Sequence, residues 1–184
     1  IANYAGGYNN IAVPAATERG IPVTNTPGVL DDSTADLTWV LLMAVARRIV
    51  EADRYMRGGE YEGWAPTLLM GTDVHHKTLG IVGLGRIGRA VATRARGLGM
   101  HVVAFDPYPS EEFADQWQID VVSFDELCAQ SDYVTMHSPS SPETLHMINA
   151  QTLAKMKAGS VLINTARGML VDEPALIDAL NSGH

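Results

Sequence analysis

Two stretches of this 184-residue chain have residue types and spacing that could do chemistry. The first is Gly83-Leu84-Gly85-Arg86-Ile87-Gly88, a GxGxxG pattern that directly follows the apolar run 78–82. In such a pattern Gly83 permits a tight turn, Gly85 lets a phosphate approach the backbone, and Gly88 lets helix and strand pack closely. The free N–H groups and positive dipole end of the next helix can hold a pyrophosphate. This stretch therefore predicts a dinucleotide site.

The acidic residue that completes this pattern is Asp106. It ends the apolar run 101–105 and lies 106 − 88 = 18 positions after Gly88, near the ~20 residues that the dinucleotide fingerprint requires. A carboxylate there can accept hydrogen bonds from both ribose hydroxyls and would repel a 2′-phosphate. The sequence therefore predicts NAD as the cofactor, with NADH preferred over NADPH.

The second stretch with chemical potential surrounds Arg167, which follows the apolar run 160–163. Its fork of donors matches the two oxygens of a carboxylate, although a surface arginine before a helix is the alternative. His137 ends the run 133–136 and either lines the adenosine side of a cofactor or serves in acid–base chemistry, the former being favoured. No histidine has metal-ligand spacing, so no metal is expected.

These residues need a sheet to bring them together, and the chain alternates strands with helices from Leu79 onward. This pattern predicts an α/β fold with right-handed crossovers and a doubly wound parallel sheet. Five strands are expected to begin at Leu79, His101, Ile119, Tyr133 and Ser160. Ligands bind outside the carboxyl ends of such strands. Three groups of loops should therefore face one crevice: Gly83–Gly88, Asp106–Tyr108 with His137–Ser138, and Thr165–Arg167.

Before this sheet lie two segments of different character. Residues 1–30 read as a β-loop-α-β piece, the tail of a domain whose beginning is absent. A single long helix is expected over Thr34–Arg57, with Asp31, Asp32 and Ser33 as candidate caps. Residues 60–76 carry large apolar side chains with little periodicity. They form either an arm packed on a neighbouring subunit or domain, or a loop folded on its own core.

The amino-acid composition limits the classes of binding partner and the cellular compartment that we expect. Lys and Arg total 13 against 21 Asp and Glu, giving a net charge of −8, so neither nucleic acid nor an anionic membrane is an expected partner. Cys128 is the one cysteine, which excludes an intrachain disulfide and indicates a reducing compartment, the cytoplasm. The most apolar stretch, 37–46, is too short to span a bilayer.

The whole chain resembles the D-isomer-specific 2-hydroxyacid dehydrogenases. The resemblance is carried by 79–88, by Asn164-Thr165-Ala166-Arg167-Gly168, and by Thr26-Pro27-Gly28 with Trp64-Ala65-Pro66, which are similar to the glyoxylate/hydroxypyruvate reductase branch. It implies hydride transfer between NAD(H) and C2 of a small 2-oxo acid. It also implies a homodimer, a flavodoxin-like substrate-binding domain ending in residues 1–30, and a Rossmann NAD-binding domain over 31–184 with a dimerisation helix and arm at about 34–76.

By match to the family, Arg167 would be catalytic and would bind the substrate carbonyl and carboxylate, with the backbone of Gly6 and Gly7 cradling the carboxylate. The residues expected to hold the cofactor are Thr34, Gly83, Gly85, Arg86, Ile87, Gly88, Asp106, Pro107, His137, Ser138, Thr144, Thr165, Ala166 and Arg167.

Three features qualify this match. The Gly6-Gly7 loop has one glycine more than is usual, and 137–141 is unusually polar. The family's acid, a histidine held by a glutamate, and a sixth strand are expected beyond residue 184, so the chain looks truncated at both ends and inactive alone. The alternatives are a non-catalytic, corepressor-like NAD-responsive module, or a phosphoglycerate or formate dehydrogenase.

Overall fold

The computed structural model describes all 184 residues and contains one parallel sheet, in the order β3-β2-β1-β4-β5. Its strands are β1 (Thr78–Val82), β2 (His101–Phe105), β3 (Asp120–Val121), β4 (Tyr133–Met136) and β5 (Val161–Asn164). The chain order reverses between β1 and β4, which pair from Leu79↔Tyr133 to Val82↔Met136. This is the Rossmann-type order with its topological switch point, so the predicted doubly wound α/β sheet is confirmed.

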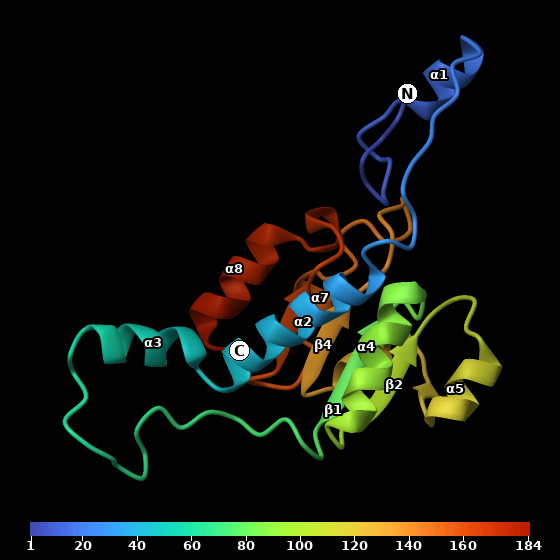
Figure 1. The fold of residues 1–184 in the computed structure, drawn as a ribbon. Helices are drawn as coiled ribbons and strands as arrows, with labels where there is room; N and C mark the ends of the chain where they lie inside the picture. The colour runs from blue at the N-terminus through green and yellow to red at the C-terminus, as the bar shows by residue number, and fades with distance from the viewer.

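Helices cover both faces of the sheet (Figure 1). On one face, α2 (Asp31–Ala46), α4 (Arg86–Gly97) and α5 (Glu111–Trp117) pack on alternate strand residues such as Leu79 and Ile81. On the other, α6 (Phe124–Gln130), α7 (Ala150–Leu153) and α8 (Glu173–Ser182) cover residues such as Val134 and Met136. Strands buried on both sides explain the near-continuous apolar runs in the sequence.

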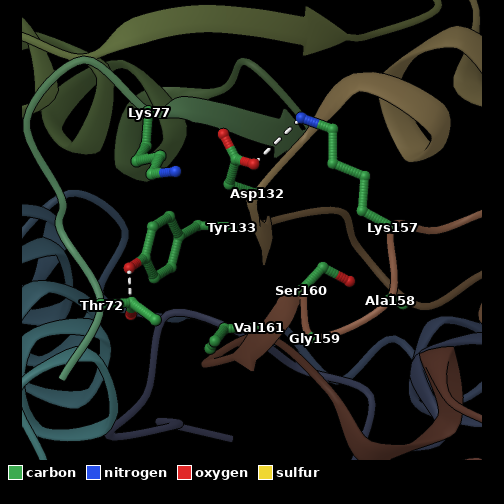
Figure 2. A pocket seen from close by; sticks show the side chains of 9 residues that line it. All are labelled: Thr72, Lys77, Asp132, Tyr133, Lys157, Ala158, Gly159, Ser160 and Val161. Carbon is green, nitrogen blue, oxygen red and sulfur yellow. Dashed lines mark hydrogen bonds and ion pairs between the residues drawn. The ribbon is translucent and has the colours of Figure 1, made fainter. Parts of the chain in front are cut away.

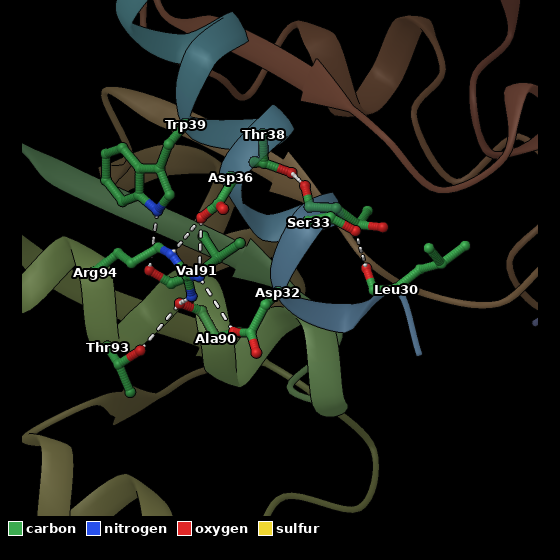
Figure 3. A network of polar contacts seen from close by, with 11 residues as sticks. Leu30, Asp32, Ser33, Asp36, Thr38, Trp39, Ala90, Val91, Thr93 and Arg94 are labelled. Atoms are coloured by element: carbon green, nitrogen blue, oxygen red, sulfur yellow. Dashed lines mark hydrogen bonds and ion pairs between the residues drawn. The ribbon is translucent and has the colours of Figure 1, made fainter. Parts of the chain in front are cut away.

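The contact between α2 and α4 has a polar network at its centre, drawn in Figure 3. Arg94 of α4 forms ion pairs with Asp32 and Asp36 of α2 at 3.2 and 2.9 Å. Trp39 of α2 donates its indole N–H to the carbonyl of Val91 at 3.3 Å. These contacts fix α2 against the helix that follows the glycine-rich loop.

The expected single helix over Thr34–Arg57 is wrong in two respects. It begins at Asp31, with Leu30 as a cap residue that makes no side-chain cap bond. It also breaks into α2 and α3 (Ile49–Arg57) at Arg48, whose φ of 54° is left-handed. The break has its cause in a tertiary contact, because the carbonyl of Ala46 accepts a hydrogen bond from Thr72 N–H at 2.8 Å. That contact comes from the returning arm, in place of the next helical turn.

The strand expected to begin at Ile119 starts one residue later and is reduced to Asp120–Val121. The chain also contains a 3-10 turn, η1 (Gly168–Leu170), immediately after Arg167.

The first 30 residues project away from the sheet in Figure 1, with α1 (Val13–Glu18) at their far end. The two expected strands there reduce to one parallel bridge between Ala2 and Thr24. A longer two-stranded ladder is not stable here, because two strands without further partner strands bury little apolar surface.

The arm over 58–76 runs along the outside of the fold (Figure 1). Tyr61, Trp64 and Met70 are exposed, Trp64 by 82%. These side chains therefore do not pack on the core of their own chain. The end of the arm is anchored, through the buried Val74 and through the hydrogen bonds of Thr72 to Ala46 and to Tyr133.

Candidate active site

The three glycines of the loop after β1 are required for different reasons. Gly83 has φ +97°, and a Cβ there would lie 2.9 Å from the backbone of His137 and Ser138. A Cβ on Gly88 would overlap the carbonyl of Gly83. Gly85, by contrast, has φ −72° and would meet nothing within 4 Å. Protein packing does not explain Gly85, whereas open space for a phosphate at the start of α4 does.

Asp106 is fixed at the tip of β2 by two backbone donors. Its Oδ2 accepts from Leu84 N–H at 2.7 Å and its Oδ1 accepts from Tyr108 N–H at 2.8 Å. The carboxylate is therefore held between the glycine-rich loop and the loop after β2. Each oxygen keeps a lone pair for a further donor, so this group can receive ribose hydroxyls. Pro107 beside it is exposed.

His137 and Ser138 lie across the switch point from the glycine-rich loop. The His137 Nε2 is 2.9 Å from the hydroxyl oxygen of Thr135, and the Ser138 hydroxyl donates to the carbonyl of Val82 at 3.3 Å. Burial lowers the pKa of His137 from 6.5 to about 4, so its ring is neutral at physiological pH. A neutral, anchored ring fits the cofactor-lining role better than that of a proton donor.

An open cleft of about 410 Å³ adjoins these loops. It is lined by Asp31, Gly85, Arg86, Ile87 and His137. The N-terminus of α4 opens into this cleft, so its free N–H groups and positive dipole end are available to an anion.

The loop after β5 is braced by Asn164. Its side-chain oxygen accepts from Ala166 N–H at 3.0 Å, and its amide donates to the carbonyl of Arg167 at 2.8 Å. The Thr165 hydroxyl pairs with the hydroxyl of Thr38 on α2 at 2.9 Å. This bracing sets the backbone of 165–167 at the carboxyl edge of the sheet.

Two residues predicted to hold the cofactor, Thr34 and Thr144, make hydrogen bonds within their own part of the chain. Thr34 accepts a hydrogen bond at its carbonyl from the Thr38 hydroxyl at 2.9 Å. The Thr144 hydroxyl donates to the carbonyl of Pro139 at 2.8 Å and accepts from Ser141 N–H at 2.8 Å. Thr144 thus stabilises its own loop, and its cofactor contact stays a prediction.

Arg167 reaches across to the N-terminal segment. Its Nε donates to the side chain of Asn9 at 3.3 Å and its Nη1 donates to the carbonyl of Ala166 at 2.7 Å. A Cβ on Gly7 would overlap Nη2 of Arg167, whereas one on Gly6 would be in ordinary contact, 3.8 Å from the carbonyl of Thr26. Gly7 therefore leaves room for the guanidinium, whereas no such close approach joins Gly6 to Arg167.

Arg167 also borders an open cleft of about 510 Å³. The cleft is lined by Asn9, His146, Arg167, Gly168, Met169, Val171, Glu173 and Pro174. A guanidinium at the side of such a cleft can bind a carboxylate by two parallel hydrogen bonds.

The sequence reasoning missed Asn9, Asn164 and Asp31. Asn9 meets Arg167 only through the fold, and no local pattern marks it. Asn164 stands directly before the predicted turn 165–167, and an Asx turn was a recognisable signal. Asp31 was considered only as a helix cap.

Other features lie away from this site. The pocket in Figure 2 is at the opposite edge of the sheet, where Lys157 pairs with Asp132 at 3.0 Å and the Tyr133 hydroxyl is 2.9 Å from that of Thr72. Burial raises the pKa of the Cys128 thiol to about 11, with a smaller contribution from Asp125, so this cysteine is a poor nucleophile.

No helix has the length and apolar character to cross a bilayer. No three His, Cys, Asp or Glu side chains gather in a way that could hold a metal ion.

Comparison with known proteins gives the class of this domain. Residues 39–184 match the family model described as D-isomer specific 2-hydroxyacid dehydrogenase, NAD binding domain. The chain belongs to this family, and NAD is the cofactor of the domain.

Individual proteins to which the chain is similar are consistent with this family. A glyoxylate reductase of Korarchaeum cryptofilum is 50% identical over 184 residues, which is 100% of this chain and 55% of that protein. The crystal structure of a glyoxylate reductase from Paecilomyes thermophila matches with TM-score 0.87 and 43% identity, covering 97% of this chain and 53% of that one. A D-lactate dehydrogenase from Aquifex aeolicus, complexed with NAD and lactic acid, matches with TM-score 0.91 and 31% identity over 100% of this chain and 54% of that one. The chain spans about half the length of the curated relatives it matches.

Proposed function

We propose that this chain forms the cofactor-binding part of an NAD-dependent D-2-hydroxyacid dehydrogenase. The enzyme would transfer hydride between NAD(H) and C2 of a small 2-oxo acid such as glyoxylate or hydroxypyruvate. The observation that carries this proposal is the close approach of Gly7 to Arg167 at the carboxyl edge of the sheet. A non-catalytic module would not need an arginine fork at the side of a second open cleft.

The residues of this chain would divide the work as follows. Gly83–Gly88 and the N-terminus of α4 would hold the pyrophosphate, with Arg86 adding a positive charge. Asp106 would accept hydrogen bonds from the adenine ribose and, by its charge, disfavour the 2′-phosphate of NADPH. Pro107, His137, Ser138, Thr34, Thr144, Thr165 and Ala166 would line the cofactor. NAD supplies a nicotinamide that accepts or donates hydride when bound.

Arg167 would act on the substrate. Its guanidinium would hold the carboxylate and polarise the adjacent carbonyl, while the backbone N–H groups of Gly6 and Gly7 would cradle the same carboxylate. Contact with Asn9 and Ala166 fixes the guanidinium in advance, which lowers the cost of orienting the side chain when substrate arrives.

The architecture proposed for the enzyme follows the same division. Residues 1–30 would belong to the substrate-binding domain and 31–184 to the NAD-binding domain. A homodimer would cover the exposed apolar side chains of α2 and the arm, which include Leu37, Val40, Val45 and Trp64. A cytoplasmic location would suit the single buried thiol of Cys128.

The test is NADH-dependent reduction of glyoxylate and hydroxypyruvate by the full-length protein, comparing wild type with Arg167→Lys. Lysine keeps the charge and loses the fork, so we expect kcat/KM for the 2-oxo acid to fall by about 100-fold or more, the scale of one lost transition-state donor. The Kd for NADH should change less than about threefold, a margin for small indirect effects.

Arg19→Lys is the matched control, because Arg19 is exposed and hydrogen-bonds only within α1. Equal loss of NADH binding and turnover in Arg167→Lys would contradict the proposed role of Arg167. A wild-type protein that binds NADH and reduces no 2-oxo acid would favour the non-catalytic alternative.

A further inference from the structure

Arg86, the cation of the glycine-rich loop, is already paired with a carboxylate of its own chain. Its Nε lies 3.0 Å from Oδ2 of Asp31. Asp31 is the first residue of α2, and Arg86 is the first residue of α4. The pair therefore joins the N-terminal ends of two neighbouring helices.

The position of Asp31 matters because it lines the same cleft as Gly85 and Arg86. The two neighbouring acids, Asp32 and Asp36, pair instead with Arg94. Asp31 is also the least exposed member of its pair, with 24% of its side chain accessible against 68% for Arg86. A negative charge is thus fixed at the wall of the cleft, while the arginine that it neutralises remains open to solvent.

A carboxylate in this place opposes an incoming pyrophosphate in two ways. It repels the phosphate charges directly, and it occupies the Nε donor of the Arg86 guanidinium, which would otherwise be free to pair with phosphate oxygens. The N-terminus of α4 still attracts the anion. The affinity for the pyrophosphate would then reflect the attraction of the α4 N-terminus reduced by the opposing charge of Asp31.

We propose that Asp31 sets the affinity for NAD by competing with the cofactor pyrophosphate for Arg86. Asp31 acts through Arg86 and through its own charge and does not touch the reacting atoms. The inference rests on the pyrophosphate role proposed above for Arg86. Its effect is to keep binding weaker than the glycine-rich loop alone would make it, which favours release of the cofactor after each turnover.

The test is titration of the full-length protein with NADH, ADP and adenosine, comparing wild type with Asp31→Asn. Removing one unit charge near a pyrophosphate in an exposed site should tighten NADH and ADP binding by about three- to tenfold. Adenosine has no phosphate, so its Kd should change less than about twofold. The gain for NADH should shrink toward nothing in 1 M salt, where the Debye length is about 3 Å.

Asp32→Asn is the matched control, since Asp32 lies in the same helical turn, is 86% exposed and pairs with Arg94. It should leave the NADH Kd within about twofold of wild type. Thermal unfolding of each variant without cofactor measures how much stability is lost with the charge at the end of the helix, so that this loss is not mistaken for a change in binding. Unchanged or weaker NADH binding by Asp31→Asn would overturn the proposal, the weaker result meaning that Asp31 orients Arg86 for the phosphate.

Arg86→Gln separates this inference from the role on which it rests. We expect it to weaken NADH and ADP binding by about tenfold, the scale of one charge-assisted hydrogen bond. An unchanged Kd would remove Arg86 from the pyrophosphate site and overturn the inference with it. Weaker binding by Arg86→Gln with no gain in Asp31→Asn would overturn the inference alone.

Discussion

Replacing Gly85 with alanine separates the requirements of the cofactor from those of the fold. The backbone of Gly85, at φ −72° and ψ −165°, is open to any residue, and an added Cβ meets nothing within 4 Å. Alanine gains about 0.4–1 kcal/mol by restricting the unfolded chain. It loses about 0.5–1 kcal/mol as a poorer helix cap than glycine. The free energy of unfolding should therefore change by less than about 0.5 kcal/mol.

Cofactor binding should respond very differently. The new methyl group would occupy the space beside the N-terminus of α4 that a phosphate needs, and it would displace the phosphate from at least one backbone donor. A hydrogen bond to a charged group is worth about 1.5–3 kcal/mol, so we expect NADH binding to weaken by about 10- to 150-fold. Calorimetric titration with NADH and denaturant unfolding, made on the same preparations, measure the two quantities.

Gly88→Ala is the matched comparison, because its Cβ would overlap the carbonyl of Gly83. Overpacking against a backbone atom should cost about 1–3 kcal/mol of stability or more. The reasoning would be refuted by a Gly85→Ala protein that binds NADH as tightly as wild type. It would also be refuted by one that loses more than about 2 kcal/mol of stability, since no structural role for Gly85 would then have been recognised.

Three further changes test the other parts of the site. Gly7→Ala should displace the Arg167 guanidinium and raise the KM for the 2-oxo acid by about tenfold in steady-state assays, with the Kd for NADH unchanged. Gly6→Ala is the control, because its methyl group has room, and it should leave this KM unchanged. Asp106→Ser should shift the ratio of NADPH to NADH affinity toward NADPH by about tenfold or more, and an unchanged ratio in competition titrations would remove Asp106 as the discriminating residue. The folded-state pKa of His137, about 4, lies below its ordinary value of 6.5, so acidification from pH 6.5 to 4 protonates the unfolded chain first and lowers stability by up to about 3 kcal/mol. Denaturant unfolding across this range should show a smaller loss for His137→Gln, and equal losses would count against a buried neutral ring.

Much of the fold followed from local patterns. The strands β1, β2 and β4 are apolar runs buried on both faces. The alternation of strands with helices predicts a parallel sheet with right-handed crossovers. Asp106 was predicted from spacing alone, and the structure holds it against Leu84 of the glycine-rich loop.

Two failures of sequence reasoning share a physical cause, which is contact between segments that are distant in the sequence. The break at Arg48 has no glycine or proline to announce it, because it depends on Thr72 taking the carbonyl of Ala46. Asn9 meets Arg167 across a separation of 158 positions in the sequence. Intrinsic propensity carries no information on such partners, and tertiary contacts override it.

The hydrogen bond between Thr72 and Ala46 has a consequence for how the molecule can be altered. Residues 47–71 leave the fold and return to the same point, where a Cβ on Gly71 would overlap the Ala46 carbonyl. The ends of the excursion are thus already joined, and closing a loop costs little more when it is long than when it is short. We therefore expect that α3 and the arm can be redesigned, or replaced by a tight turn, while the sheet and the crevice keep their geometry.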